Sequence, residues 1–138
     1  MTLISWNVNG VRSAERKGFI DWLKQGNYEV VGIQETKVSD HQILNHALRH
    51  PDGYESFWHG AKEKLGYSGV AVYTKVKPQA VRTYFDASLL SGEGRVLELD
   101  FGEFIFFNIY FPNGKASPAR LEYKLTFYRQ FLAQIKSL

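Results

Sequence analysis

The distribution of apolar and polar positions over the first 34 residues predicts a strand, a helix and a second strand. Thr2–Trp6 is a short apolar run typical of a buried strand. Arg12–Gln25 has apolar residues on one helical face and is followed by Gly26-Asn27, a common helix stop. Tyr28–Gln34 is apolar almost throughout, as expected for a strand buried on both faces. This order predicts a βαβ unit with two parallel strands.

The rest of the chain predicts a short helix, several strands and a final helix. Ser39 is expected to cap the short helix, and the pattern changes to strands after Pro51-Asp52-Gly53. The short turns between these strands favour a largely antiparallel meander. The expected strands are Tyr54–His59, Gly69–Lys75, Gln79–Tyr84, Arg95–Phe101 and Glu103–Phe111.

The final helix is expected to begin at Ser117-Pro118, a cap residue followed by a proline at the first helical position. Apolar residues then recur at spacings of four and three, so one face of this helix is apolar. The residues of that face are Leu121, Leu125, Tyr128, Leu132 and Ile135.

Composition limits the classes of protein that the chain can belong to. Its 138 residues, 44% of them hydrophobic, fit one globular domain and exclude a disordered chain. The absence of cysteine excludes disulfides and thiolate metal sites, and suits a cytoplasmic protein. We expect no membrane partner and no secretory signal, because no segment approaches the roughly 20 apolar residues of a membrane span. A net charge of +3 is compatible with a polyanionic partner such as nucleic acid.

Two polar side chains follow the two strands of the predicted βαβ unit. Asn7 comes after the first strand and Glu35 after the second. Because ligands of open α/β sheets bind beyond the carboxyl ends of the strands, we expect both side chains at one rim. One carboxylate with a nearby amide suits Mg²⁺, which prefers oxygen ligands and keeps several waters. The alternative from spacing alone is a solvated carboxylate and a turn asparagine.

Other polar residues are candidates for phosphate or DNA contacts. Arg12 and Lys17 lie where the first helix is expected to begin, and a solvated helix surface is the alternative for them. Tyr67 lies between glycines in a polar loop and is either a stacking residue or part of a packed turn. Tyr110 and Asn113 flank a Pro-containing turn, which is expected to bring them to the rim of Glu35; otherwise Tyr110 is a core aromatic. No zinc spacing, Ser-His-Asp order or Gly-rich phosphate loop is present.

Several segments in order resemble the exonuclease III type of apurinic/apyrimidinic endonuclease, within the endonuclease/exonuclease/phosphatase superfamily. The segments cover essentially the whole chain: ISWNVNGVR, IQETK, GYSGVAVYTK, EGRVLELDF, and NIYFPNGK followed by RLEYKLTFY. The resemblance implies Mg²⁺-dependent cleavage of DNA 5′ to abasic sites and removal of nucleotides from 3′ ends, with Mn²⁺ as the alternative metal. The DNA partner would be a duplex with abasic sites or 3′ ends.

The resemblance also implies roles for individual residues. Glu35 would be the carboxylate ligand of the metal, Asn7 would orient the active-site network beside it, and Tyr110 would contact the scissile phosphate. Lys37 would support this network, and Asn9 stands where some family members carry an aspartate beside the metal. The residues that would approach the DNA are Arg12, Lys17, Tyr67 and Asn113.

Family members continue into a second half with a Gly-Asp-Phe-Asn segment and a terminal Ser-Asp-His, and neither occurs in this sequence. We therefore expect residues 1–138 to be the N-terminal part of such a domain and to be inactive alone. The expected fold is half of a DNase I-like four-layer α/β-β/α sandwich, with one mixed sheet, flanking helices and an inner face that lacks its partner. A complementary C-terminal half, or self-association, would cover that face. The alternative functions are a non-catalytic DNA-binding or partner-completing half-domain, and a phosphatase-like relative.

Overall fold

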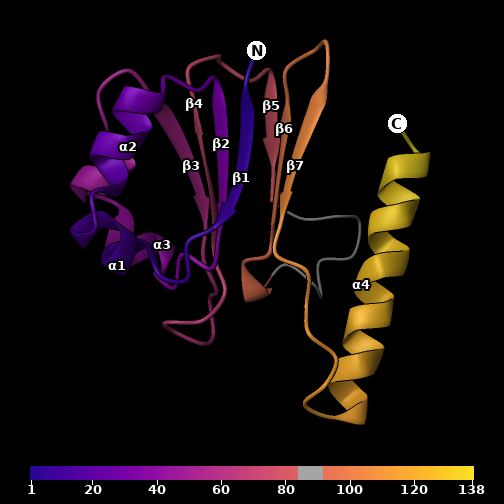
Figure 1. The fold of residues 1–138 in the computed structure, drawn as a ribbon. Coiled ribbons are helices and arrows are strands. Elements are labelled where there is room, and N and C mark those ends of the chain that lie inside the picture. Colours follow the sequence, from indigo (N-terminus) through magenta and orange to yellow (C-terminus); the bar gives the residue numbers. More distant parts are fainter. Residues whose placement is uncertain (84–91) are drawn as a thin grey trace.

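The protein, described by a computed structural model over residues 1–83 and 92–138, has two β-sheets packed face to face with helices outside (Figure 1). The helices are α1 (Val11–Arg16), α2 (Phe19–Gly26), α3 (Asp40–Ile43) and α4 (Pro118–Lys136), with a 3₁₀ turn at Ala47–Arg49. The strands are β1 (Leu3–Asn7), β2 (Val30–Gln34), β3 (Glu55–His59), β4 (Val70–Thr74), β5 (Ala80–Arg82), β6 (Val96–Asp100) and β7 (Ile105–Ile109). Tyr84, the last residue of one expected strand, lies outside the described residues.

The first sheet, which we call the mixed sheet, has the strand order β1-β2-β4-β3. β1 and β2 are parallel, as expected for a βαβ unit, whereas β4 is antiparallel to both β2 and β3. The second sheet, which we call the antiparallel sheet, is the meander β5-β6-β7. The α/β fold class with a mixed sheet and flanking helices is thus confirmed.

The expectation of a single sheet with an uncovered inner face is wrong. The inner face of the mixed sheet packs against the antiparallel sheet, in a cluster that includes Val30, Val72, Leu97 and Leu99. β6 alternates, because Leu97 and Leu99 enter this cluster while Val96 packs against Phe127 of α4. β6 is buried on both faces, between the mixed sheet and α4, so the chain contributes to all four layers.

The helix expected over Arg12–Gln25 is two helices. Gly18 has φ +98, a left-handed conformation that glycine adopts readily, and it separates α1 from α2. Lys17 is therefore the C-terminal cap residue of α1 and does not lie at a helix start. Phe19 and Leu23 are buried against the mixed sheet, as their spacing predicts.

Two helices are capped by the serines that the sequence predicts. Ser39 accepts a hydrogen bond from the backbone of Gln42, whose side chain bonds back to Ser39, which makes a complete capping box at α3. Ser117 caps α4 in the same way, by accepting from Arg120 N at 3.1 Å. These short-range signals place both helix starts where the sequence predicts them.

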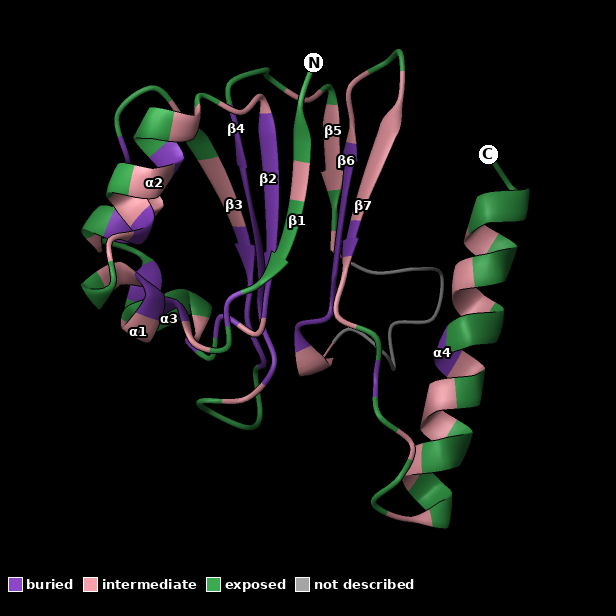
Figure 2. Ribbon diagram, viewed as in Figure 1, coloured by how far each residue is buried: buried purple, intermediate pink, exposed green. Residues whose placement is uncertain are grey.

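The apolar stripe of α4 faces away from the antiparallel sheet. Its side chains are 40–51% exposed, and Figure 2 shows the exposed and half-buried residues along this helix. The buried contact to the sheet is made instead by Phe127, which is completely buried, with Tyr123 and Phe131 beside it. The stripe residues, Leu121, Leu125, Tyr128, Leu132 and Ile135, are thus exposed in the described structure.

β1 is the second exposed apolar element. It pairs with β2 along one edge, and among the described strands none pairs with its other edge. Leu3 and Trp6 of β1 are 44% and 40% exposed, although β2 beside them is buried throughout (Figure 2). Among the described helices, none combines the length and the apolar character needed to cross a bilayer.

Candidate active site at the carboxyl ends of β1 and β2

The backbone pairing between β1 and β2 continues past the ends of both strands. Gly10 N donates to Glu35 O at 2.7 Å, and Val11 N donates to Thr36 O at 3.0 Å. On the other side, Thr36 N and Lys37 N donate to the backbone oxygens of the loop that precedes β4. The loops that follow β1 and β2 are therefore tied together by main-chain hydrogen bonds before any side chain is considered.

Three residues at this rim have the left-handed backbone conformation. The φ angles are +49° at Asn9, +54° at Glu35 and +58° at Lys37. For residues other than glycine such a conformation costs on the order of 1–3 kcal/mol, asparagine being the most tolerant. The main-chain pairing of the rim overcomes this cost, and the three side chains leave the backbone in directions that a regular strand end would not provide.

The side chains of Asn7 and Glu35 meet at this rim, as expected. Asn7 Nδ2 donates to Glu35 Oε1 at 2.9 Å, and Asn9 N donates to Asn7 Oδ1 at 3.0 Å. Lys37 Nζ lies 2.6 Å from Asn9 Oδ1 and 3.6 Å from Glu35 Oε2. Four residues, one at the end of β1 and three in the loops that follow β1 and β2, thus form one hydrogen-bonded network around a single carboxylate.

Tyr110 reaches the same carboxylate from the antiparallel sheet. The hydrogen bond from Asn7 is the main cause that lowers the pKa of Glu35; burial opposes it, and Tyr110 and Lys37 lower it further. For Tyr110, burial is the main cause of a raised pKa, and the hydrogen bond and negative charge of Glu35 add to it. At neutral pH Glu35 is therefore an ionised acceptor and Tyr110 a protonated donor.

The donor set fits a hard divalent cation. Glu35 supplies an ionised carboxylate that is partly exposed, and Asn7 keeps it in one orientation through its amide. Asn7 Oδ1 accepts from Asn9 N, which leaves one lone pair for a second partner. Mg²⁺ commonly takes one or two protein oxygens and completes its shell with water and phosphate, so these residues suit it.

A second group of expected site residues borders a neighbouring hollow of about 590 Å³. Tyr67 lines it from the loop before β4, and Asn113 lines it from the turn after β7. Its other lining side chains are Lys64, Glu93, Lys115, Ala116 and Arg120. Three of these are basic, so the hollow presents positive charge beside two side chains that can hydrogen-bond.

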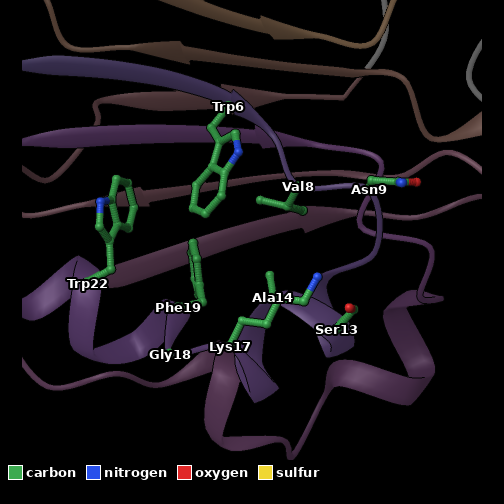
Figure 3. A pocket seen from close by; sticks show the side chains of 9 residues that line it. All are labelled: Trp6, Val8, Asn9, Ser13, Ala14, Lys17, Gly18, Phe19 and Trp22. Atoms are coloured by element: carbon green, nitrogen blue, oxygen red, sulfur yellow. The ribbon is translucent and has the colours of Figure 1, made fainter.

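Arg12 and Lys17 are not brought into either group. Both are exposed on or just after α1. Lys17 instead lines a hollow of about 340 Å³ between β1 and the two helices, which Asn9 of the rim network also lines. Figure 3 shows Trp6, Phe19 and Trp22 grouped at one side of this hollow, with Asn9 at the other.

Sequence reasoning did not assign two groups of residues that the structure places beside the site. Arg95 donates to Tyr67 and to the backbone of Tyr110, and its partner Glu93 is bound by Arg120. Asn108, buried between the sheets, accepts from Gln34 at 2.7 Å and donates to two main-chain oxygens of the mixed sheet. An asparagine inside the apolar run IFFNIY was the available signal for the second group.

Comparisons with known proteins show which proteins this chain is similar to. An exodeoxyribonuclease of Bacillus subtilis (strain 168) is 35% identical over 139 aligned residues, which cover 100% of this chain and 53% of that protein. A DNA-(apurinic or apyrimidinic site) endonuclease of Dictyostelium discoideum is 36% identical over 126 residues, covering 91% of this chain and 34% of that protein. The solved structure of an AP endonuclease from Archaeoglobus fulgidus matches with a TM-score of 0.81 at 28% identity, covering 97% of this chain and 51% of that one.

The chain thus spans about half the length, or less, of these relatives. The names of the relatives confirm the resemblance to exonuclease III-type apurinic/apyrimidinic endonucleases. The model of the Endonuclease/Exonuclease/phosphatase family matches residues 4–137, nearly the entire sequence. With its mixed sheet, its second sheet and an asparagine–glutamate pair at the strand ends, the chain belongs to the Endonuclease/Exonuclease/phosphatase family.

Proposed function

We propose that this chain carries the metal- and phosphate-binding part of a DNA-repair phosphodiesterase. The complete enzyme would use Mg²⁺, with Mn²⁺ as the alternative, to cleave DNA 5′ to abasic sites and to remove nucleotides from 3′ ends. The observation that carries the proposal is the ionised Glu35, which receives hydrogen bonds from Asn7 and Tyr110 at one rim. The names of the relatives supply the substrate class.

Each residue of the rim has a separate task in this proposal. A bound Mg²⁺ would polarise a phosphoryl oxygen and offset the charge that develops during attack by water. Glu35 would hold the metal, and Asn7 would keep the carboxylate in place and serve as a second candidate ligand. Tyr110, protonated at neutral pH, would donate its hydroxyl hydrogen to an oxygen of the scissile phosphate. Lys37 would hold the side chains of Asn9 and Glu35 at a fixed separation, because its ammonium group contacts both.

The DNA partner would be a duplex that contains an abasic site or a 3′ end. Tyr67 and Asn113 border the basic hollow next to the rim, which supports contacts to the sugar-phosphate backbone there. The exposed side chains of Arg12 and Lys17 extend the positive surface on the α1 side. Binding that depends on such phosphate contacts weakens as salt is raised.

We also propose that a complementary C-terminal half completes the fold. The open edge of β1 and the exposed stripe of α4 support this, because both are apolar surfaces next to buried layers. The matched relatives have about twice the length of the alignment. In the absence of such a half we expect self-association through the same two surfaces. We place the protein in the cytoplasm, with which the lack of cysteine is consistent.

The second candidate is a non-catalytic half-domain that binds DNA or a partner half. It is favoured by the composition of the rim, since the described residues contain no group of three or more His, Cys, Asp or Glu side chains able to hold a metal. One carboxylate leaves the activation of water to groups from elsewhere.

The metal site is tested by titrating the purified chain with Mg²⁺ and following Glu35 by NMR. Glu35→Gln should abolish the saturable change of the NMR signals around position 35 on addition of Mg²⁺, because a neutral amide binds Mg²⁺ poorly. Glu55→Gln is the matched control, since Glu55 is an exposed carboxylate at the opposite end of the mixed sheet. Unchanged Mg²⁺ affinity in Glu35→Gln would contradict the assignment.

The activity is tested with the chain mixed with the C-terminal half of the Bacillus relative and a duplex that carries an abasic site. Mg²⁺-dependent cleavage that falls about 100-fold or more in Tyr110→Phe supports the catalytic proposal, since a lost donor to a developing charge costs about that much. Duplex binding by the mixture without any cleavage supports the second candidate instead.

A further inference from the structure

Arg95, just before β6, is a buried cation that the roles proposed above do not use. Its side chain is 2% exposed, which is rare for an arginine and costly unless the charge is paired. All three guanidinium nitrogens donate to protein acceptors: Nε to Glu93 Oε1 at 2.9 Å, Nη1 to Tyr110 O at 3.0 Å, and Nη2 to Tyr67 Oη at 2.6 Å.

Two of these acceptors belong to the two groups of the candidate site. Tyr110 contacts Glu35 at the rim, and Tyr67 lines the neighbouring basic hollow. The guanidinium carbon also lies 4.9 Å from the centre of the Tyr110 ring and 5.5 Å from that of Tyr67, within the range of cation–π attraction. One side chain therefore contacts both aromatic residues, and each of them through more than one interaction.

Arg95 is itself held in place by its neighbours. Glu93 is bound by Arg120 through two hydrogen bonds of 2.8 and 3.0 Å, so the carboxylate bridges two arginines. Burial raises the pKa of Glu93, but the bonds from Arg120 and Arg95 lower it overall, which keeps the carboxylate ionised at neutral pH. Gly94, between Glu93 and Arg95, has φ +62, and a Cβ atom at this position would lie 2.4 Å from the carbonyl carbon of Gly60, so the backbone is closely packed there.

We propose that Arg95 is a positioning residue that joins Tyr110 and Tyr67 into one unit, so that the rim and the basic hollow keep a constant separation. This inference rests on the proposed function, in which the rim takes the scissile phosphate and the hollow takes the adjacent backbone. Because the guanidinium is buried and its three nitrogens already donate to the protein, it acts through the two tyrosines and makes no contact with DNA.

The first test follows the two tyrosines by NMR in the purified 138-residue chain, with ¹³C at the Cζ atoms. The two signals are assigned with Tyr67→Phe and Tyr110→Phe. In Arg95→Gln the Tyr110 signal should shift at neutral pH, because the guanidinium carbon that lies 4.9 Å from the centre of its ring is lost. The Tyr67 signal should move as well, since its hydroxyl loses a donor.

Two further variants keep this test decisive. Arg82→Gln removes another arginine–glutamate pair of the antiparallel sheet, that with Glu98, and should leave both tyrosine signals unchanged. Arg95→Lys retains the charge and loses the planar fork, so the Tyr67 signal should move, whereas the Tyr110 signal should stay closer to that of the wild type. It takes the place of Arg95→Gln if that variant does not fold. Unchanged Tyr67 and Tyr110 signals in a folded Arg95 variant would overturn the inference.

The second test measures the coupling on DNA, with a duplex that contains an abasic-site analogue and Mg²⁺. Tyr67→Phe should weaken binding about fivefold in the wild type, the effect of one lost hydrogen bond, and less than twofold in Arg95→Gln. Equal weakening in both backgrounds would refute positioning through Tyr67. A wild-type chain that does not bind the duplex would refute the proposed function, and the NMR result would then still decide the role of Arg95.

Discussion

Replacing Asn108 by alanine should destabilise the protein more than any other single change at a polar residue of the inter-sheet layer. The side chain is 2% exposed and makes three hydrogen bonds, with Gln34 Nε2 at 2.7 Å, Ile33 O at 3.0 Å and Ala71 O at 2.8 Å. A net value of about 1 kcal/mol for each bond gives a loss of about 3 kcal/mol, before the buried amide of Gln34 is left with fewer partners.

The measurement is urea unfolding followed by tryptophan fluorescence and circular dichroism. With a slope of about 1.5 kcal/mol per molar urea, Asn108→Ala should lower the midpoint by about 2 M. Asn113→Ala is the matched control, because that asparagine is exposed and accepts one local bond, from Lys115 N. We expect a change below about 0.5 kcal/mol for the control.

A double-mutant cycle with Gln34→Ala tests the reason for the loss. Because the two amides bond to each other, their effects should be coupled by about 1 kcal/mol. The reasoning would be refuted by a midpoint in Asn108→Ala that matches the Asn113→Ala control. Strictly additive effects of Asn108→Ala and Gln34→Ala would show that the amide–amide bond carries no part of the stability.

Three further predictions concern the rim, the glycine before β6, and α4. Asn7→Ala should raise the pKa of Glu35 toward 4.5, as measured by the ¹³C titration of its carboxyl group, and an unchanged titration would contradict the assigned cause. In the wild type, the stabilisation that this carboxylate gives is complete above pH 4.5 and is lost as the pH falls through its lowered pKa. Gly94→Ala should lower the free energy of unfolding by more than about 1 kcal/mol, because it combines a positive φ with a clash; wild-type thermal stability would refute this. Phe127→Ala should cost about 3–5 kcal/mol in urea unfolding, whereas Leu125→Ala, on the exposed stripe, should cost less than about 1, and similar losses would mean that the stripe is covered.

The features that the sequence predicts correctly depend on interactions between residues close together in the chain, or between the ends of adjacent parallel strands. Ser39 and Ser117 cap their helices because capping involves residues only three positions apart. Asn7 and Glu35 meet because the carboxyl ends of parallel neighbours lie at one edge of a sheet. Tyr110 directly follows β7 of the other sheet; its turn predicts its place at this rim, and the family resemblance adds its role at the phosphate.

The features that the sequence does not predict depend on packing between distant segments. Periodicity shows that α4 has an apolar stripe, but the antiparallel sheet instead covers Phe127, which lies off the stripe. The same holds for Arg95, whose importance comes from Tyr67 and Tyr110, distant in the sequence. The break at Gly18 depends on the left-handed backbone there, and an isolated glycine in a helical pattern does not by itself indicate it.

The main-chain bonds that extend beyond β1 and β2 have a consequence for hydrogen exchange. The amide protons of Gly10, Thr36 and Lys37 lie in loops, yet each is donated to a backbone oxygen of a neighbouring segment. They should therefore exchange with deuterium as slowly as amides inside a strand, and only when the mixed sheet itself opens. The rim would then be preorganised before any ion or nucleotide arrives, so little ordering entropy would remain to be lost when a ligand binds.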